Sequence, residues 1–236
     1  MKVAICGRSG RYGHFCSTFD TMELTLISNY SGKSSLVLSL LRMAVLKQGS
    51  VLVDDEDICT IPSDTIRSAF NVVPQDPVLV PGSIRLNLDP NDQKSDSDII
   101  SILTRLSLWD IISSRGNLAS NIDMIPFSQG QKQLFCFARS ILSNADKMIL
   151  ILDESTSNMD FQTETLALDM LDEFFPHHTI VAVAHRLETV VRYDKIAVLD
   201  SGKLIEWDSP SNLLASEDGA FKALWDSHCM LSESQT

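Results

Sequence analysis

A run of small polar residues with one lysine, close to position 30, is suited to binding phosphate. The run precedes the helical pattern of residues 36–43 and consists of Ser31, Gly32, Lys33, Ser34 and Ser35. At the start of a helix, backbone N–H groups and the helix dipole attract phosphate, a lysine reaches the terminal phosphates and a serine hydroxyl ligates Mg²⁺. The full pattern G-x-x-x-x-G-K-[ST] needs a glycine at position 27, where this chain has Ile27. The motif as written is therefore half of a phosphate-binding loop.

The other half lies upstream, directly after the apolar run of residues 3–6. Gly7 and Gly10 stand where a phosphate-binding loop begins, at the end of an expected strand. Removing residues 11–30 joins Gly10 to Ser31 and gives G-R-S-G-S-G-K-S-S, which is a complete loop in the right context. We therefore predict that residues 11–30 are an insertion within the loop.

Residues 11–30 raise two questions: how the insertion arose, and whether part of it can replace residues 3–6 as the strand before the phosphate-binding loop. The insertion's length preserves the reading frame, and the codons at its two edges can carry splice signals, so a retained intron is a hypothesis for its source. Residues 24–27 are strand-like as well, and they could compete with residues 3–6 for the place before Gly32. A split loop is also expected to weaken phosphate binding, because its N–H groups must converge as one continuous nest.

Two adjacent carboxylates follow another apolar run, residues 148–152. Asp153 and Glu154 stand at the end of this expected strand. An acid in that place suits a Mg²⁺ site beside a triphosphate, and a second carboxylate beyond it can polarise an attacking water. The alternative, a strand that ends in solvated acids, is common and stays open at this point.

A serine and a glycine open the helix expected over residues 131–142. Ser128, Gly130 and Gln131 offer a hydroxyl and free N–H groups that can face an anion. Ordinary N-capping is the alternative interpretation, and for this motif taken by itself it is the favoured one. The motif alone does not decide between the two interpretations.

A glutamine and a histidine also follow apolar runs. Gln75 comes after the apolar residues Val72 and Val73 and can reach a metal or a water from a loop. His185 comes after residues 179–183, where it is either a phosphate contact at a strand end or a core histidine. Neither residue is informative by itself.

The remaining pattern predicts the elements that position these residues. Apolar runs without polar alternation indicate strands buried on both faces of a parallel sheet, and they occupy residues 3–6, 148–152, 179–183 and 195–199. Ligands bind at the carboxyl ends of such strands, where Gly7, Asp153 and His185 stand. Between residues 81 and 143 the spacing becomes helical, with helices expected over 95–108 and 131–142. An α/β domain with a helical insertion is the prediction.

Composition excludes several classes of protein. The 236 residues suffice for one α/β domain, and the net charge of −12 argues against a nucleic-acid partner. No apolar run is long enough to span a bilayer, and the first residues predict a strand rather than a signal peptide. The five scattered cysteines are expected to be reduced thiols. We expect an intracellular chain.

The order of these motifs resembles that of the ATP-binding-cassette (ABC) ATPases. In the family's terms the motifs are Walker A, the Q-loop at Gln75, the signature at Ser128, Walker B at Asp153, the D-loop at Asp160 and the H-loop at His185. Residues 73–77 and 81–90 are similar to the C subfamily, the multidrug-resistance-associated exporters. Residues 184–189, 199–202 and 206–210 are similar to the C-terminal cassette of those exporters.

The resemblance implies a P-loop NTPase whose RecA-like, mostly parallel sheet comprises residues 1–80 and 144–236. An inserted α-helical signature subdomain would comprise residues 81–143. The family's N-terminal β-strands, and the aromatic residue that stacks on adenine, are missing from this sequence.

The resemblance also implies ATP and Mg²⁺ as ligands and a role for each motif residue. The phosphates would be held by Gly7, Gly10, Ser31, Gly32, Lys33, Ser34 and Ser35. The Mg²⁺ ligands would be Ser34, Gln75 and Asp153. The catalytic residues would be Glu154, His185 and Lys33.

The implied partners are a second cassette and the membrane domains of an exporter, which would hold the chain on the cytoplasmic side of a membrane. Family members hydrolyse ATP in a sandwich of two cassettes, so Ser128, Gly130 and Gln131 would face the nucleotide of the partner. Asp160 would lie at the interface between the two. As a separate fragment the chain would be cytoplasmic, and no nucleic acid is expected as a partner.

Departures from the family leave three functions open. The signature reads Phe-Ser-Gln-Gly-Gln at residues 127–131 in place of the usual Leu-Ser-Gly-Gly-Gln. The main departure is the insertion at residues 11–30. The chain is therefore either an ATP-hydrolysing cassette of a C-type exporter or an inactive remnant with a disrupted phosphate loop. A less favoured third function is that of an ABC ATPase that is not coupled to transport.

Overall fold

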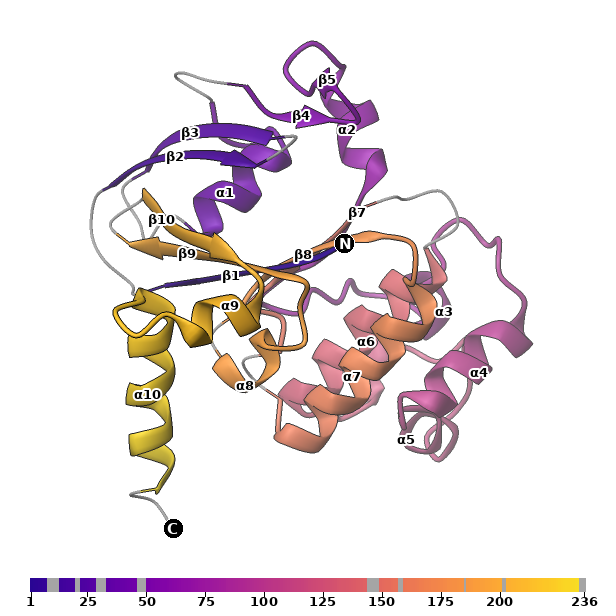
Figure 1. The fold of residues 1–236 in the computed structure, drawn as a ribbon. Helices are drawn as coiled ribbons and strands as arrows, with labels where there is room; N and C mark the ends of the chain where they lie inside the picture. Colours follow the sequence, from indigo (N-terminus) through magenta and orange to yellow (C-terminus); the bar gives the residue numbers. More distant parts are fainter. Residues whose placement is uncertain are drawn as a thin grey trace. The chain divides into compact units, whose positions relative to one another are not determined.

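The computed structural model describes most of the chain, and the chain forms two compact units. The described residues are 1–7, 13–19, 22–28, 33–45, 50–143, 149–156, 159–184, 186–200 and 203–233. Unit 1 comprises Met1–Phe70 and Thr179–Thr236, and unit 2 comprises Asn71–His178. Figure 1 shows the elements of both units.

The sheet of unit 1 is built around the first strand of the chain. Strand β1 (Lys2–Gly7) lies between β8 (Thr179–Val183) and β9 (Lys195–Asp200) and is parallel to both. Strand β10 (Lys203–Asp208) pairs with β9 in the antiparallel direction. Val3 is 4% exposed, and β8 and β9 also carry buried apolar side chains, as expected for strands covered on both faces. The strands predicted at residues 3–6, 179–183 and 195–199 are thus present (Figure 1).

Residues of the expected insertion form a hairpin between β1 and the first helix. Strands β2 (Gly13–Phe19) and β3 (Met22–Ser28) pair with each other in a two-stranded antiparallel sheet of their own. Helix α1 (Lys33–Leu40) follows. The alternative in which residues 24–27 take the place of residues 3–6 in the parallel sheet is wrong, because β1 holds that place through its pairing with β8 and β9.

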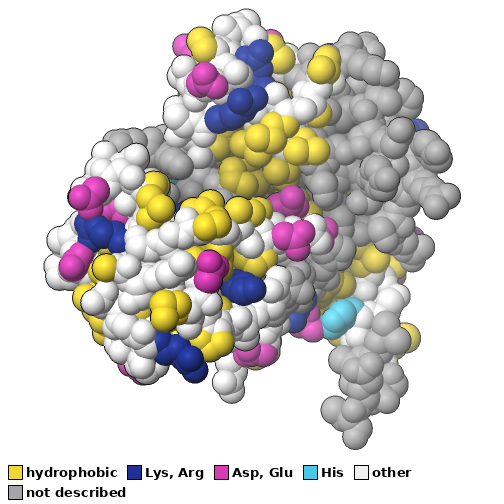
Figure 2. Space-filling model, turned by 180° about the vertical axis from the view of Figure 1, so that it is seen from behind, with side chains coloured by type: hydrophobic (Ala, Val, Ile, Leu, Met, Phe, Trp, Pro, Cys, Tyr) yellow, Lys and Arg dark blue, Asp and Glu magenta, His cyan; other side chains and the backbone are white. Residues whose placement is uncertain are grey.

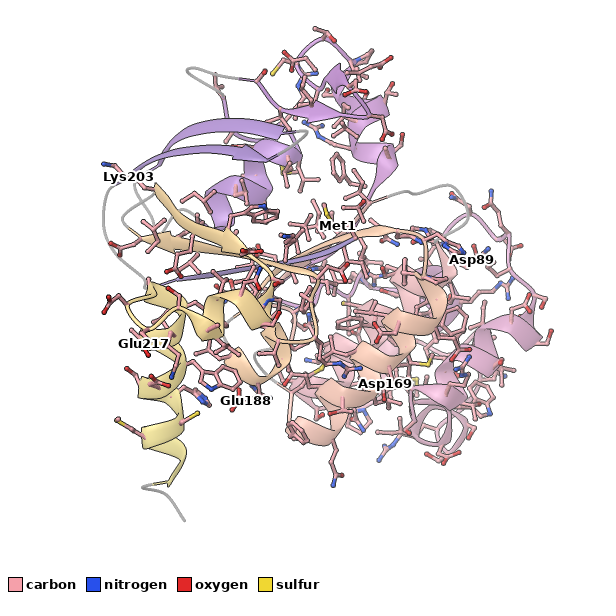
Figure 3. The ribbon with its side chains drawn as sticks, in the orientation of Figure 1. Met1, Asp89, Asp169, Glu188, Lys203 and Glu217 are labelled. Carbon is pink, nitrogen blue, oxygen red and sulfur yellow. The ribbon has the colours of Figure 1, made fainter. Side chains whose placement is uncertain are left out.

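Short elements complete unit 1. They are β4 (Leu52–Val53), β5 (Glu56–Asp57), α2 (Ser63–Ala69), α8 (Leu187–Val190), α9 (Pro210–Ala215) and α10 (Ala220–Glu233). Helix α10 is fixed at its start, because the backbone N–H groups of Ala220 and Phe221 donate to the Glu206 carboxylate at 2.7 and 2.8 Å. Farther along the helix, His228 Nε2 lies 3.1 Å from Oε1 of Glu188, which Figure 3 labels.

Unit 2 is mainly helical. Its strands are β6 (Phe70–Val73), which begins at the end of unit 1, and β7 (Ile149–Asp153), and they are neighbours in the sheet. Its helices are α3 (Ile84–Leu88), α4 (Asp96–Arg105), α5 (Trp109–Ser113), the 3₁₀ turn Ile122–Met124, α6 (Gln129–Leu142) and α7 (Phe161–Phe174). Helix α6 packs against α3, α4 and α7, and its Phe135 and Phe137 are completely buried.

Local chemistry sets the helix bounds in unit 2. Helix α6 starts at Gln129, two residues before the predicted start, because Ser128 caps it. The helix predicted over residues 95–108 ends at Arg105, since Ser107 adopts a left-handed backbone with φ of 57°. Helices α3 to α6 all lie within residues 81–143.

Large apolar side chains reach the surface of unit 2 at several points. They include Val78, Val80, Leu86, Met124 and Phe161. Figure 2 shows the rear face, on which hydrophobic and charged side chains are interspersed. Across the residues that the structure describes, we find no helix whose length and hydropathy would let it span a bilayer.

Candidate nucleotide-binding site

The side chains of Gln75 and Glu154 meet in unit 2, although they are 79 positions apart in the sequence. Gln75 Nε2 donates a hydrogen bond to Glu154 Oε2 over 2.9 Å. Gln75 follows β6 by two residues and Glu154 follows β7 directly, and these strands are neighbours in the sheet. The fold thereby brings together two candidate residues that sequence spacing alone leaves far apart.

The backbone at the candidate acids is unusual. Glu154 adopts a left-handed conformation with φ of 47°, which costs a residue with a Cβ about 1–2 kcal/mol. Backbone strain of this kind gathers at functional sites. Asp153, the last residue of β7, has its Oδ1 atom shielded from solvent. The alternative of two solvated acids at a strand end therefore does not describe Asp153.

This group of residues fits a magnesium site. Mg²⁺ prefers carboxylate and carbonyl oxygens and is bound in phosphate sites through one or two carboxylates. Asp153 offers a partly buried carboxylate, and Gln75 offers a carboxamide on the neighbouring strand end. The hydrogen bond to Glu154 orients that carboxamide beside the acids.

The signature residues form a capping box at the start of α6. Ser128 Oγ accepts from the backbone N–H of Gln131 at 3.2 Å, and Gln131 Oε1 accepts from the backbone N–H of Ser128 at 2.9 Å. Gly130 lies in the first helical turn. The capping interpretation is thus confirmed for this chain, and it leaves the exposed Ser128 at a helix N-terminus, where an anion is favoured.

Asp160 caps the other long helix of unit 2, α7. Its carboxylate accepts from the backbone N–H of Thr163 at 3.0 Å and from the Thr163 hydroxyl at 2.7 Å. These hydrogen bonds from Thr163 hold the pKa of the Asp160 carboxyl below its ordinary value. Asp160 is therefore an exposed, firmly ionised group at a helix start.

The candidate phosphate-loop residues that the structure describes lie in unit 1. Gly7 is the last residue of β1, and the first turn of α1 contains Lys33, Ser34 and Ser35. The β2–β3 hairpin separates these two groups along the chain. Gly10, Ser31, Gly32 and His185 lie outside the described residues.

Sequence reasoning missed two residues that hold the Gln75 segment. Gln133 Nε2 donates to the Pro74 carbonyl at 2.8 Å, and Arg139 Nη2 donates to the Val78 carbonyl at 3.0 Å. A signal for Gln133 existed, because it interrupts the apolar face of the predicted helix and is 1% exposed in the structure.

Comparison with known proteins identifies the family. The family model described as "ABC transporter" matches residues 26–157, more than half of the 236 residues. The match begins within residues 11–30, so Gly7 and Gly10 lie outside the matched range. The matched range includes part of β3 but not β1, whereas in the structure it is β1 that lies between β8 and β9.

Curated relatives and a solved structure agree with this family. The chain is 42% identical over 234 residues to "ABC multidrug transporter B" of Aspergillus fumigatus, covering 99% of this chain and 14% of the relative. It is 40% identical over 199 residues to "ABC transporter C family member 2" of Dictyostelium discoideum, covering 82% of this chain and 14% of the relative.

The fold resembles that of a bacterial Atm1-family ABC exporter solved with ATP bound, with a TM-score of 0.79 and 29% identity over 96% of this chain and 36% of the exporter. The chain thus spans a small part of the length of the relatives that it matches. The α/β fold, the motif order and these matches agree: the chain belongs to the ABC transporter family and comprises its ATP-binding domain.

Proposed function

We propose that this chain is the ATP-binding and ATP-hydrolysing cassette that powers export by a C-type ABC transporter, of which it forms one part. The observation that carries the proposal is the contact between Gln75 and Glu154 beside the partly buried Asp153. Membership of the family implies that the bound nucleotide is ATP, and this group of side chains can hold the metal and orient the attacking water.

Each candidate residue has a role in this function. Lys33 would neutralise the terminal phosphates. Ser34, Gln75 and Asp153 would hold Mg²⁺, which would supply positive charge beside the phosphates. Glu154 orients the attacking water and accepts its proton. His185 contacts the γ-phosphate.

The proposed partners are a second cassette and the membrane domains of the exporter. Ser128, Gly130 and Gln131 face the nucleotide of the second cassette, with Asp160 at the interface. The apolar side chains of Val78, Val80 and Leu86 are exposed and therefore accessible to a protein partner. The chain then works on the cytoplasmic side of a membrane. Its net charge of −12 argues against a nucleic-acid partner.

A second candidate function rests on the hairpin between Gly7 and Lys33. A phosphate-binding loop needs its N–H groups in one continuous nest, and residues 13–19 and 22–28 form two paired strands instead. The chain as written is then an inactive remnant of the cassette, and residues 11–30 are an insertion such as a retained intron. An ABC ATPase uncoupled from transport is a third and weaker candidate.

Equilibrium Mg-ATP binding tests these candidates, using the chain as written and a variant without residues 11–30. If residues 11–30 interrupt the loop, the shortened chain should bind at least about tenfold more tightly, the effect of one or two hydrogen bonds to phosphate. Lys33→Ala in the shortened chain is the control for binding through the loop. Glu154→Gln should keep binding but lose hydrolysis in the presence of a partner cassette.

Each outcome decides between the candidates. Equally tight binding by both chains refutes the interrupted loop and favours the active cassette. Tight binding by the shortened chain alone supports the remnant. Absence of binding by both chains contradicts the nucleotide-binding function itself.

A further inference from the structure

Helix α6 holds the chain on both sides of Gln75 through two of its side chains. Gln133 Nε2 donates to the carbonyl of Pro74 at 2.8 Å, and Arg139 Nη2 donates to the carbonyl of Val78 at 3.0 Å. Pro74 and Val78 bracket residues 75–77. A short loop that would otherwise be fixed only at its strand is therefore tied to one helix at both ends.

The burial of Gln133 shows which of its atoms matters. The side chain is 1% exposed, and its Oε1 atom has no hydrogen-bond partner within the part of the chain that the structure describes. A buried acceptor without a partner costs free energy that an apolar side chain of the same size would avoid. What the carboxamide contributes is therefore its donor, and that donor is used on Pro74.

A buried asparagine adds to the hydrogen bond between Arg139 and the Val78 carbonyl. Arg139 Nε donates to the backbone carbonyl of Asn87 at 2.6 Å. The Asn87 side chain, which is 2% exposed, bonds both the N–H and the carbonyl of Val80 at 2.8 Å. The backbone after Gln75 is thus held to α6 at Val78 directly and at Val80 through Asn87.

The hydrogen bonds from Gln133 and Arg139 to the backbone affect the contact between Gln75 and Glu154. The Pro74 carbonyl belongs to the planar peptide bond that leads into Gln75, so fixing it fixes that plane and with it the position of the Gln75 Cα, from which the side chain starts. Gln75 itself is exposed, and its surroundings do not confine it. Its 2.9 Å hydrogen bond to Glu154 therefore depends on the backbone that α6 holds.

We propose that Gln133 and Arg139 are positioning residues that hold residues 74–78 rigidly to α6, the helix that Ser128 caps. A displacement at the signature end of α6 then moves Gln75 relative to Glu154 within the same unit. The significance of this link for ATP hydrolysis rests on the proposed function, but the link itself does not.

The test is a side-chain amide resonance of Gln75 in the full 236-residue chain without nucleotide, together with hydrogen exchange within residues 75–78, measured at the backbone amides of Gln75, Asp76 and Val78. The resonance is identified by its loss in Gln75→Ala. Gln133→Met keeps the volume and removes the donor. We expect the resonance to move toward the position of a free amide and exchange to rise about fivefold, the factor that one net hydrogen bond provides.

Asn71→Leu is the matched control. Asn71 Nδ2 donates to the Ser140 carbonyl at 2.8 Å, so this change removes an equally short hydrogen bond between β6 and the same helix, away from Gln75. The control is expected to leave the Gln75 resonance and the exchange of residues 75–78 as in the wild type. Arg139→Lys provides an independent variant and should shift the resonance in the same direction as Gln133→Met.

Two results would overturn the proposal. One is a folded Gln133→Met or Arg139→Lys chain with an unchanged Gln75 resonance and unchanged exchange. The other is an equal change in Asn71→Leu, which would mean general loosening of α6. Both measurements are made without nucleotide, so neither result contradicts the proposed function. The proposed function is contradicted separately if the chain without residues 11–30 does not bind Mg-ATP.

Discussion

Replacing Asn87 by alanine should destabilise unit 2 by about 3 kcal/mol. The side chain is 2% exposed and makes three short hydrogen bonds to backbone groups. Nδ2 donates to the carbonyls of Val80 and Ser83 at 2.8 and 3.0 Å, and Oδ1 accepts from the Val80 N–H at 2.8 Å. Each bond contributes about 1 kcal/mol net. The Val80 N–H and carbonyl lose the Asn87 side chain as a partner, whereas the Ser83 carbonyl still accepts from the Asn87 backbone N–H at 3.2 Å.

The assay is urea unfolding followed by tryptophan fluorescence. Trp109 lies in unit 2, whereas Trp207 and Trp225 lie in unit 1, so a background with Trp207→Phe and Trp225→Phe reports on unit 2 alone. A loss of 3 kcal/mol is a large share of the 5–15 kcal/mol that is typical of a domain, and it lowers the unfolding midpoint without changing the slope.

Asn117→Ala is the control for this prediction. Asn117 is exposed and its carboxamide accepts only from the neighbouring Ala119 N–H at 2.9 Å among the bonds described. The expected change is within about 0.5 kcal/mol. If Asn87→Ala lowers the free energy of unfolding by less than about 1 kcal/mol, the reasoning from its three hydrogen bonds is refuted.

Two further predictions concern a helix cap and a turn. The pKa of the Asp160 carboxyl lies below its ordinary value of 3.8 because Thr163 donates to it, so the ionised form stabilises the fold above that pH and the stabilisation is lost as pH falls through the lowered pKa. Asp160→Asn keeps a capping oxygen without the charge. Its free energy of unfolding, measured by denaturant, should lie below that of the wild type at pH 7, and this difference should become smaller as the pH is lowered to 3. A difference that stays constant would contradict the prediction. Gly82→Ala should destabilise unit 2 by about 1 kcal/mol or more in thermal unfolding, because Gly82 has φ of 142° and a Cβ there would lie 2.8 Å from Leu86 Cδ2. An unchanged melting temperature would show that the turn adapts.

The strands were predictable because their signal is local. Residues 3–6, 179–183 and 195–199 are short apolar runs, and burial on both faces of a parallel sheet is the environment that such runs favour. The cap at Ser128 was predictable for a similar reason, since a serine three residues before a glutamine satisfies the first N–H groups of a helix.

The links between distant segments were not predictable in this way. Gln133 has a polar side chain that is usually solvated, and its partner Pro74 lies 59 positions away. Only the packing of α6 shows that the donor is buried and directed at that carbonyl. The end of α4 at Arg105 depends in the same way on a left-handed Ser107 that no local preference requires.

The place of β1 between β8 and β9 has a consequence for the order in which the chain is made. After Gly7 the ribosome must add 172 residues (179 − 7) to reach Thr179, the first residue of β8, before β1 meets its first partner, which takes about 9–34 seconds at about 5–20 residues per second. Unit 2 has a shorter wait, because a contact such as Gln75–Glu154 joins residues that are 79 positions apart and that both precede β8. The middle of the chain is therefore ready to fold first, while an apolar N-terminal strand stays exposed to chaperones until synthesis reaches β8.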